Sequence, residues 1–184
     1  MRIHIETPAR LNLATGNRIT ATRWARLLRE LGHRVTVSHR RQVPSCDLLV
    51  ALHAGKSASV ITDFHRRFRH RLIVLALTGT DLYSSVIHRR TTREALRLAT
   101  KLVVLQPEGV NAIPPAFRRK GVVILQSATP SKGTPRRHTF QVCVLAHLRA
   151  VKDPFRVAYA ARLLKPPSRI HVVHFGAAMS EAAA

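Results

Sequence analysis

The sequence predicts an α/β fold with a parallel sheet, and two observations lead to this prediction. Short apolar segments of strand length alternate with longer amphipathic segments of helix length, a pattern typical of right-handed βαβ units in a doubly wound sheet. The segment 47–52 is almost continuously apolar, as expected for a strand buried on both faces. We therefore expect one complete domain at 1–127, a linker at 128–138 and an incomplete second domain at 139–184.

The first domain is expected to contain six strands separated by helices. The strand segments are 2–6, 33–38, 47–52, 71–77, 101–105 and 122–125. Helices are expected at 17–31, 56–69 and 91–99, and a short one begins near Pro107 and ends before Pro114. Asn17 is the expected N-cap of the first helix and Gly32 its stop signal. Its expected apolar stripe consists of Ile19, Trp24, Leu27, Leu28 and Leu31.

The C-terminal part of the chain predicts the opening of a second α/β domain. The stretch 128–138 is rich in Pro, Ser, Thr, Lys and Arg and has no periodicity, which is typical of a linker. A strand at 140–146, a helix at 154–164 and a strand at 169–175 then follow. This order is the first βαβ portion of a further sheet.

The charge of the chain favours anionic partners. Its formal net charge is +22, from 31 Lys and Arg against 9 Asp and Glu, which suits nucleic acid, phosphorylated small molecules or a membrane surface. Aromatic residues make up only 5%, so stacking platforms for a nucleic-acid strand are scarce and nucleic acid is the less favoured partner. A basic α/β module that binds nucleic acid or another polyanion without catalysis stays as the alternative to an enzyme.

The sequence also indicates a cellular location and the state of its thiols. No apolar run approaches the roughly 20 residues that span a bilayer, and the first residues lack the pattern of a signal peptide. We expect no membrane span and a cytoplasmic location. Cys46 and Cys143 are far apart and show no metal-type spacing, so we expect two reduced, packed thiols and no metal.

Gly16, Asn17 and Arg18 form a candidate phosphate site between the first strand and the first helix. Gly16 permits a tight turn and close approach of the backbone. The helix N-terminus offers N–H groups and partial positive charge, to which Arg18 adds a full charge. The segment matches neither a dinucleotide-binding fingerprint nor a Walker loop, so an ordinary turn with a solvated arginine is an equally good interpretation.

Further candidates follow the third and fourth strands, where the carboxyl ends of parallel strands line a cleft. His53 could orient an acceptor or move a proton, or simply cap a helix. Thr78 and Gly79 belong to a string in which Gly79 permits an unusual backbone and Asp81 could accept a hydrogen bond from a sugar or act as a base. Asp81 could instead cap the following turn. Weaker candidates at equivalent strand ends are Gln106, Gln126 and Ser127.

Arg149 and Lys152 are the strongest candidate pair. Both follow the first strand of the second domain, and both can converge on neighbouring phosphate oxygens. A departing nucleoside diphosphate gains negative charge, which fixed cations stabilise without a metal. The alternative is that they are two exposed basic residues on a basic protein.

Several strings together resemble glycosyltransferases of the GT-B type in the family 4 group, and within it the selenosugar synthases of selenoneine biosynthesis. The strings lie in order at 16–35, 46–54, 76–83, 102–106 and 147–155, and the most specific are Thr-Gly-Thr-Asp and Lys-Asp-Pro-Phe. The resemblance implies a GT-B fold with one complete Rossmann-like domain and the first βαβ portion of the second. It also implies transfer of a sugar from a UDP-sugar to selenophosphate or a similar phosphorylated acceptor, with a carbon–selenium bond formed and no cofactor.

The resemblance assigns the donor diphosphate to Arg149 and Lys152, and it places the phosphate-bearing acceptor near Gly16 and His53. Family members continue well past residue 184 with a glutamate-bearing motif for the donor. A truncated second domain is therefore expected, and with it weak or no activity of the isolated chain. A phosphosugar-binding remnant without catalysis is the third hypothesis.

Overall fold

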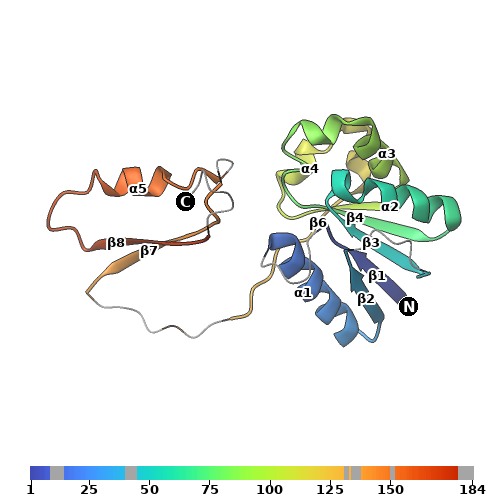
Figure 1. Ribbon diagram of the computed structural model, residues 1–184, viewed down its shortest axis with the longest axis horizontal. Coiled ribbons are helices and arrows are strands. Elements are labelled where there is room, and N and C mark those ends of the chain that lie inside the picture. The colour runs from blue at the N-terminus through green and yellow to red at the C-terminus, as the bar shows by residue number, and fades with distance from the viewer. Residues whose placement is uncertain (9–14, 40–44, 131–132, 134–137, 150–151, 178–184) are drawn as a thin grey trace. The chain divides into compact units, whose positions relative to one another are not determined.

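A computed structural model describes residues 1–8, 15–39, 45–130, 133, 138–149 and 152–177. The chain divides into two compact units, Met1–Ala128 and Thr129–Ala184 (Figure 1). Of the expected linker, 131–132 and 134–137 lie outside the described residues.

The first unit is built on a six-stranded sheet in which all neighbouring strands run parallel. Its strands are β1 (Arg2–Glu6), β2 (Arg34–Ser38), β3 (Leu48–Leu52), β4 (Leu72–Leu77), β5 (Lys101–Val104) and β6 (Gly121–Val123). Helices flank the sheet, so the unit is α/β and Rossmann-like, as predicted. The six expected strands are all present, each with ends within about two residues of those expected.

The described residues of this unit form four α-helices and two 3₁₀-helices. They are α1 (Gly16–Glu30), α2 (Ala54–Arg67), η1 (Ser85–His88), α3 (Arg90–Leu98), α4 (Gly109–Ala112) and η2 (Pro115–Lys120). The prediction that Asn17 caps α1 is wrong, because the helix begins at Gly16 and its N-cap is Thr15. The carbonyl of Thr15 already accepts the N–H of Ile19 at 3.0 Å, so the first turn closes two residues earlier than predicted.

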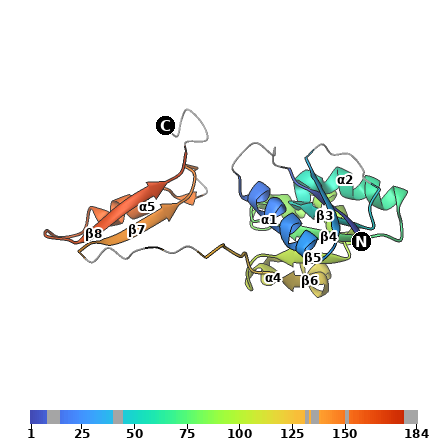
Figure 2. The same ribbon diagram turned by 90° about the horizontal axis from the view of Figure 1, so that it is seen from below.

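Alternation along the buried strands separates two hydrophobic clusters on opposite faces of the sheet. On β3, Leu49 and Ala51 belong to the cluster beneath α2 and α3, whereas Val50 and Leu52 belong to the cluster beneath α1. The views in Figures 1 and 2 place α1 on one face and α2 on the other. The sheet is therefore covered on both faces, as the continuous apolar strands predict.

The buried stripe of α1 differs from the predicted one. Ala21 and Ala25 are fully buried, while Leu27 and Leu31 are exposed. Two alanines let the helix axis lie close to the sheet, and Trp24 and Leu28 pack at the side of this contact. The small size of the two alanines therefore determines which face of α1 contacts the sheet. The face predicted from hydrophobicity alone is partly exposed to solvent.

The order of strands, β2-β1-β3-β4-β5-β6, contains one reversal of direction. The chain passes from β1 outward to β2, and then returns to place β3 on the other side of β1. In open α/β sheets such a reversal opens a crevice at the carboxyl ends of the two central strands. Here those ends belong to β1 and β3, and they lead to α1 and α2.

The second unit contains β7 (Phe140–Leu145), α5 (Arg156–Ala161) and β8 (Ile170–Phe175). The two strands pair in parallel from Phe140 with Ile170 to Leu145 with Phe175 and form a sheet of their own. The helix is shorter than the predicted 154–164. The prediction of a packed Cys143 is wrong, since this thiol is exposed. In a sheet of two strands and one short helix, alternate side chains of β7 have no layer to pack against.

None of the helices in the described part of the chain is long and apolar enough to span a bilayer.

Candidate functional site

His53 is held at the carboxyl end of β3 in a single orientation. Its backbone lies in the left-handed region, with φ of +69°, and its side chain is 7% exposed. Nδ1 accepts a hydrogen bond from the backbone N–H of Lys56 at 3.3 Å. We therefore assign the proton to Nε2, which lies 3.2 Å from Oγ1 of Thr80 and donates to it. The ring thus connects the first turn of α2 to the loop after β4.

Asp81 links the same two segments, the start of α2 and the loop after β4. It is 0% exposed, and its two oxygens accept hydrogen bonds from two backbone N–H groups, Thr78 at 2.9 Å and Ala54 at 2.7 Å. An anion at the N-terminus of α2 also favours the helix dipole. Asp81 therefore caps α2 and folds its own loop. Its complete burial gives it a positioning role in place of direct contact with a sugar hydroxyl or a reacting proton.

Burial sets the protonation state of His53. Removal of the imidazole from water lowers its pKa below the ordinary value of 6.5, and the charge of Lys56 acts in the same direction. The carboxylate of Asp81, 4.0 Å from Nδ1, opposes this effect. Since the burial effect is the largest, His53 is neutral at pH 7 and offers its one N–H to the exposed hydroxyl of Thr80.

The N-terminus of α1 follows β1, the other strand of the reversal, and among the described residues no side chain caps it. The Thr15 side chain makes no capping hydrogen bond, and its buried Oγ1 has no hydrogen-bond partner in the described residues. An added Cβ at Gly16 would meet no described atom within 4 Å. Among the described residues the two helix starts therefore differ: side chains accept hydrogen bonds from the first N–H groups of α2, whereas no side-chain cap is found at the start of α1.

The loop after β4 has the geometry that the sequence indicates. Gly79 has a φ of +119°, a value that strongly favours glycine. Its carbonyl accepts the N–H groups of both Leu82 and Tyr83 at 2.9 Å. This turn brings Thr80 over His53.

The weaker strand-end candidates are occupied by contacts within the first unit. Nε2 of Gln106 donates to the Tyr83 hydroxyl at 2.7 Å, and Nε2 of Gln126 donates to Oγ1 of Thr20 at 3.1 Å. Gln126 thus ties the segment after β6 to α1. Ser127 is exposed.

Arg149 and Lys152 lie in the second unit, in the loop that follows β7. Both side chains are exposed, and the backbone N–H of Lys152 donates to the carbonyl of Arg149 at 2.8 Å, which places both residues in one turn. The nearby Asp153 is taken by Arg156 at 2.7 Å. In the part of the chain that the structure describes, neither side chain has a hydrogen bond or ion pair.

The backbone at Gly176 anchors this loop. An added Cβ there would lie 1.9 Å from the carbonyl oxygen of Ala146, so only glycine fits the close approach. Next to it, the N–H of Leu148 donates to the carbonyl of Ala177 at 3.1 Å. The end of β8 thus positions the chain just before Arg149.

The structure brings the predicted residues His53, Thr78 and Asp81 together, and it adds Thr80, to which the sequence alone assigns no role. Thr80 stands between two residues that were singled out, so its place in the Gly-Thr-Asp string was the available signal. In the described part of the chain, no group of three or more His, Cys, Asp or Glu residues could hold a metal ion.

Comparison with models of protein families gave no match to this chain, and neither did comparison with curated proteins.

Proposed function

We propose that this chain is a glycosyltransferase of the GT-B type. It transfers a sugar from a UDP-sugar to an anionic acceptor, which we propose is selenophosphate. The observation that carries the proposal is the strand reversal at β1 and β3, where the start of α1 faces the same edge as the pair His53–Thr80. The resemblance of the motifs at 16–35, 76–83 and 147–155 supplies the reaction class.

The proposed acceptor site uses the start of α1. Backbone N–H groups at Gly16 and Asn17, together with the charge of Arg18, would hold the phosphate oxygens of selenophosphate. The selenium atom would form a bond to C1 of the sugar as the bond from C1 to the diphosphate oxygen breaks. The UDP leaves with that electron pair, so the step requires no oxidant or reductant.

The neutral His53 serves this site through Thr80. Because Nε2–H donates to the Thr80 hydroxyl, the hydroxyl hydrogen is directed toward solvent and toward a bound ligand. The buried Asp81 holds the start of α2 and the loop after β4 together through its two hydrogen bonds. The proposal therefore gives Thr80 the direct hydrogen bond to a sugar or acceptor oxygen and gives His53 the task of orienting it.

The proposed donor site uses Arg149 and Lys152. Two exposed cations in one turn can stabilise the charge that develops on the departing diphosphate. Calorimetric titration of the 184-residue chain with UDP tests this role. We expect R149A/K152A to weaken UDP binding at least tenfold. Equal affinities of the two proteins would refute the donor site.

The chain offers a closely matched control for this titration. Arg162 and Lys165 have the same residue types and spacing, and both are exposed in the second unit, so R162A/K165A removes the same charge and should leave UDP affinity unchanged. Mass spectrometry of reactions with UDP-sugars and selenophosphate then tests catalysis. A selenium-containing sugar that forms with the chain, and forms more slowly with T80V, is the expected result.

A further inference from the structure

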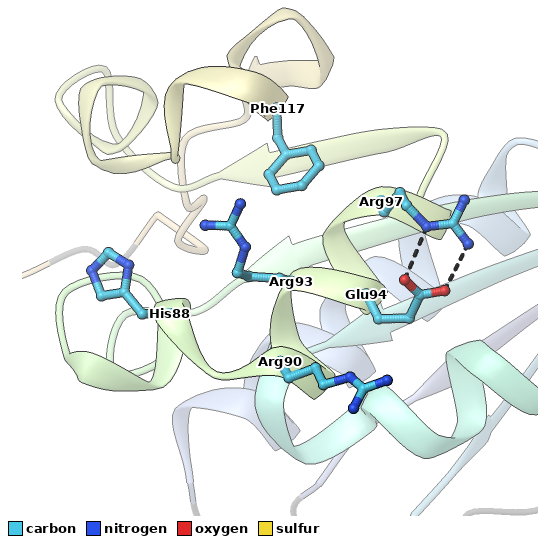
Figure 3. A pocket seen from close by; sticks show the side chains of 6 residues that line it. All are labelled: His88, Arg90, Arg93, Glu94, Arg97 and Phe117. Atoms are coloured by element: carbon cyan, nitrogen blue, oxygen red, sulfur yellow. Dashed lines mark hydrogen bonds and ion pairs between the residues drawn. The ribbon is translucent and has the colours of Figure 1, made fainter.

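A hollow of about 760 Å³ lies beside α3 in the first unit, and the proposed sugar transfer does not use it. It is lined by His88, Arg90, Arg93, Glu94, Arg97 and Phe117 (Figure 3). These residues come from η1, α3 and η2. The size is in the range of pockets that hold a small organic ligand.

The arginines lie along one face of α3, because positions 90, 93 and 97 are three and four residues apart. In the view of Figure 3, Arg93 stands between His88 and the Phe117 ring. The Arg93 guanidinium lies 5.9 Å from the centre of that ring. The backbone N–H of Arg93 donates to the carbonyl of Arg89 at 2.9 Å, but within the described part of the chain its side chain has no hydrogen bond or ion pair, so the guanidinium donors remain available.

The other end of the hollow is partly neutralised. Glu94 accepts two hydrogen bonds from Arg97, at 2.7 and 2.9 Å, and these bonds lower the pKa of Glu94, so that it stays ionised. Arg90 lies near the same carboxylate and lowers its pKa further. Three guanidinium groups against one carboxylate leave an excess of two positive charges.

Several other cations of this unit donate to acceptors of the protein itself. Arg71 donates to the carbonyl of Cys46 at 2.6 Å and lies over Phe68. Arg118 donates to two backbone carbonyls, and Lys120 donates to three. The cations in the hollow thus exceed the acceptors that the fold provides there.

We propose that this hollow binds a nucleotide that carries two or more phosphates. Guanidinium forks on Arg90 and Arg93 match phosphate oxygens and stay charged at all physiological pH values. The half-buried Phe117 supplies one ring face beside them, which suits one base. A free nucleoside polyphosphate and the end of a nucleic-acid strand share this chemistry, and a single ring favours the free nucleotide.

Titration of the 184-residue chain with ATP, inorganic tripolyphosphate and an eight-residue oligouridylate tests the proposal. We expect ATP to bind, and R90A/R93A to weaken ATP and tripolyphosphate at least tenfold each. F117L should weaken the affinity for ATP severalfold and leave the affinity for tripolyphosphate unchanged. E94Q should strengthen both ligands, because it removes the negative charge from the hollow.

The control is R23A/R26A on α1, which removes two arginines at the same helical spacing on the opposite face. ATP affinity should not change in this variant, and R149A/K152A should also retain it. Because UDP also carries two phosphates, the UDP titration of the donor site is made in the R90A/R93A background, so that the two tests fail or succeed separately. An equal loss in R23A/R26A, or full ATP affinity in R90A/R93A, overturns the assignment. Tighter binding of oligouridylate than of ATP at 150 mM salt would also overturn it in favour of a strand. Fluorescence of Trp24 verifies that each variant is folded.

Discussion

Asp81 accepts a hydrogen bond from the backbone N–H of Ala54 at 2.7 Å, although 27 residues separate the two. The other carboxylate oxygen holds the N–H of Thr78. One buried group therefore joins the start of α2 to the loop after β4, and this loop carries Thr80 to His53. The corner depends on a contact between two distant segments, and its stability can be measured.

We expect D81N to lower the free energy of unfolding by about 2–4 kcal/mol, because an amide nitrogen would then face one of two buried N–H donors. Urea unfolding monitored by the fluorescence of Trp24, the one tryptophan of the chain, measures this loss in the first unit. D63N is the control. Asp63 pairs with Arg66 at the surface, and its loss should cost less than about 1 kcal/mol. Similar effects of the two substitutions would contradict the structural role of Asp81.

The lowered pKa of His53 predicts a specific dependence of stability on pH. As pH falls through 6.5, the unfolded chain takes up the proton at this position before the folded chain does. The contribution of the neutral ring is therefore complete above pH 6.5 and is lost as pH falls toward the lower folded pKa. Unfolding of the native chain and of H53N, measured from pH 8 to pH 5, isolates this effect from the other histidines. Asparagine suits the positive φ at this position. Parallel curves for the two proteins would rule the effect out.

The two cysteines should react at very different rates. Burial raises the pKa of the Cys46 thiol, and this residue is 3% exposed, so its reactive thiolate is both scarce and covered. Cys143 is exposed. We expect iodoacetamide to modify Cys143 rapidly at pH 8 and Cys46 only as the first unit unfolds. Peptide mass spectrometry after timed labelling distinguishes the two sites, with C143S as the control for the slow phase.

G176A should loosen the loop before Arg149. A Cβ at this position would overlap the Ala146 carbonyl, so the ends of β7 and β8 must separate. Trypsin should then cleave after Arg149 and Lys152 several times faster than in the native chain, because local opening exposes the backbone. At Gly133 an added Cβ meets no described atom within 4 Å, and G133A should leave the cleavage rate unchanged. An unaltered rate in G176A would show that the close approach is dispensable.

Strand positions were predictable because apolar runs such as Leu48–Leu52 report burial directly. Helix ends were less so. The start of α2 lies two residues before the predicted one, since its first N–H is capped by Asp81 from a later loop. No local pattern around Ala54 contains that information. The contact face of α1 was missed for a related reason, because close packing selected Ala21 and Ala25 over larger residues.

The candidate site was predictable where strand ends carry unusual residues, as at His53 and Gly79. The hollow on α3 was not predicted, although Arg90, Arg93 and Arg97 already have the spacing of one helix face. Its other wall is η2, and the pair Pro114–Pro115 was interpreted only as the end of a helix. A 3₁₀ turn that returns Phe117 to α3 is a tertiary arrangement, and composition gives no sign of it.

Lys120 gives this wall a consequence of its own. Its ammonium group gathers the last carbonyls of α3, those of Leu96, Arg97 and Ala99, and it is the final residue of η2. Three hydrogen bonds therefore connect the two sides of the hollow at one end, and they form without a bound ligand. The shape of the hollow is therefore preformed. Its cations are already spaced before an anion binds, so binding costs little conformational entropy.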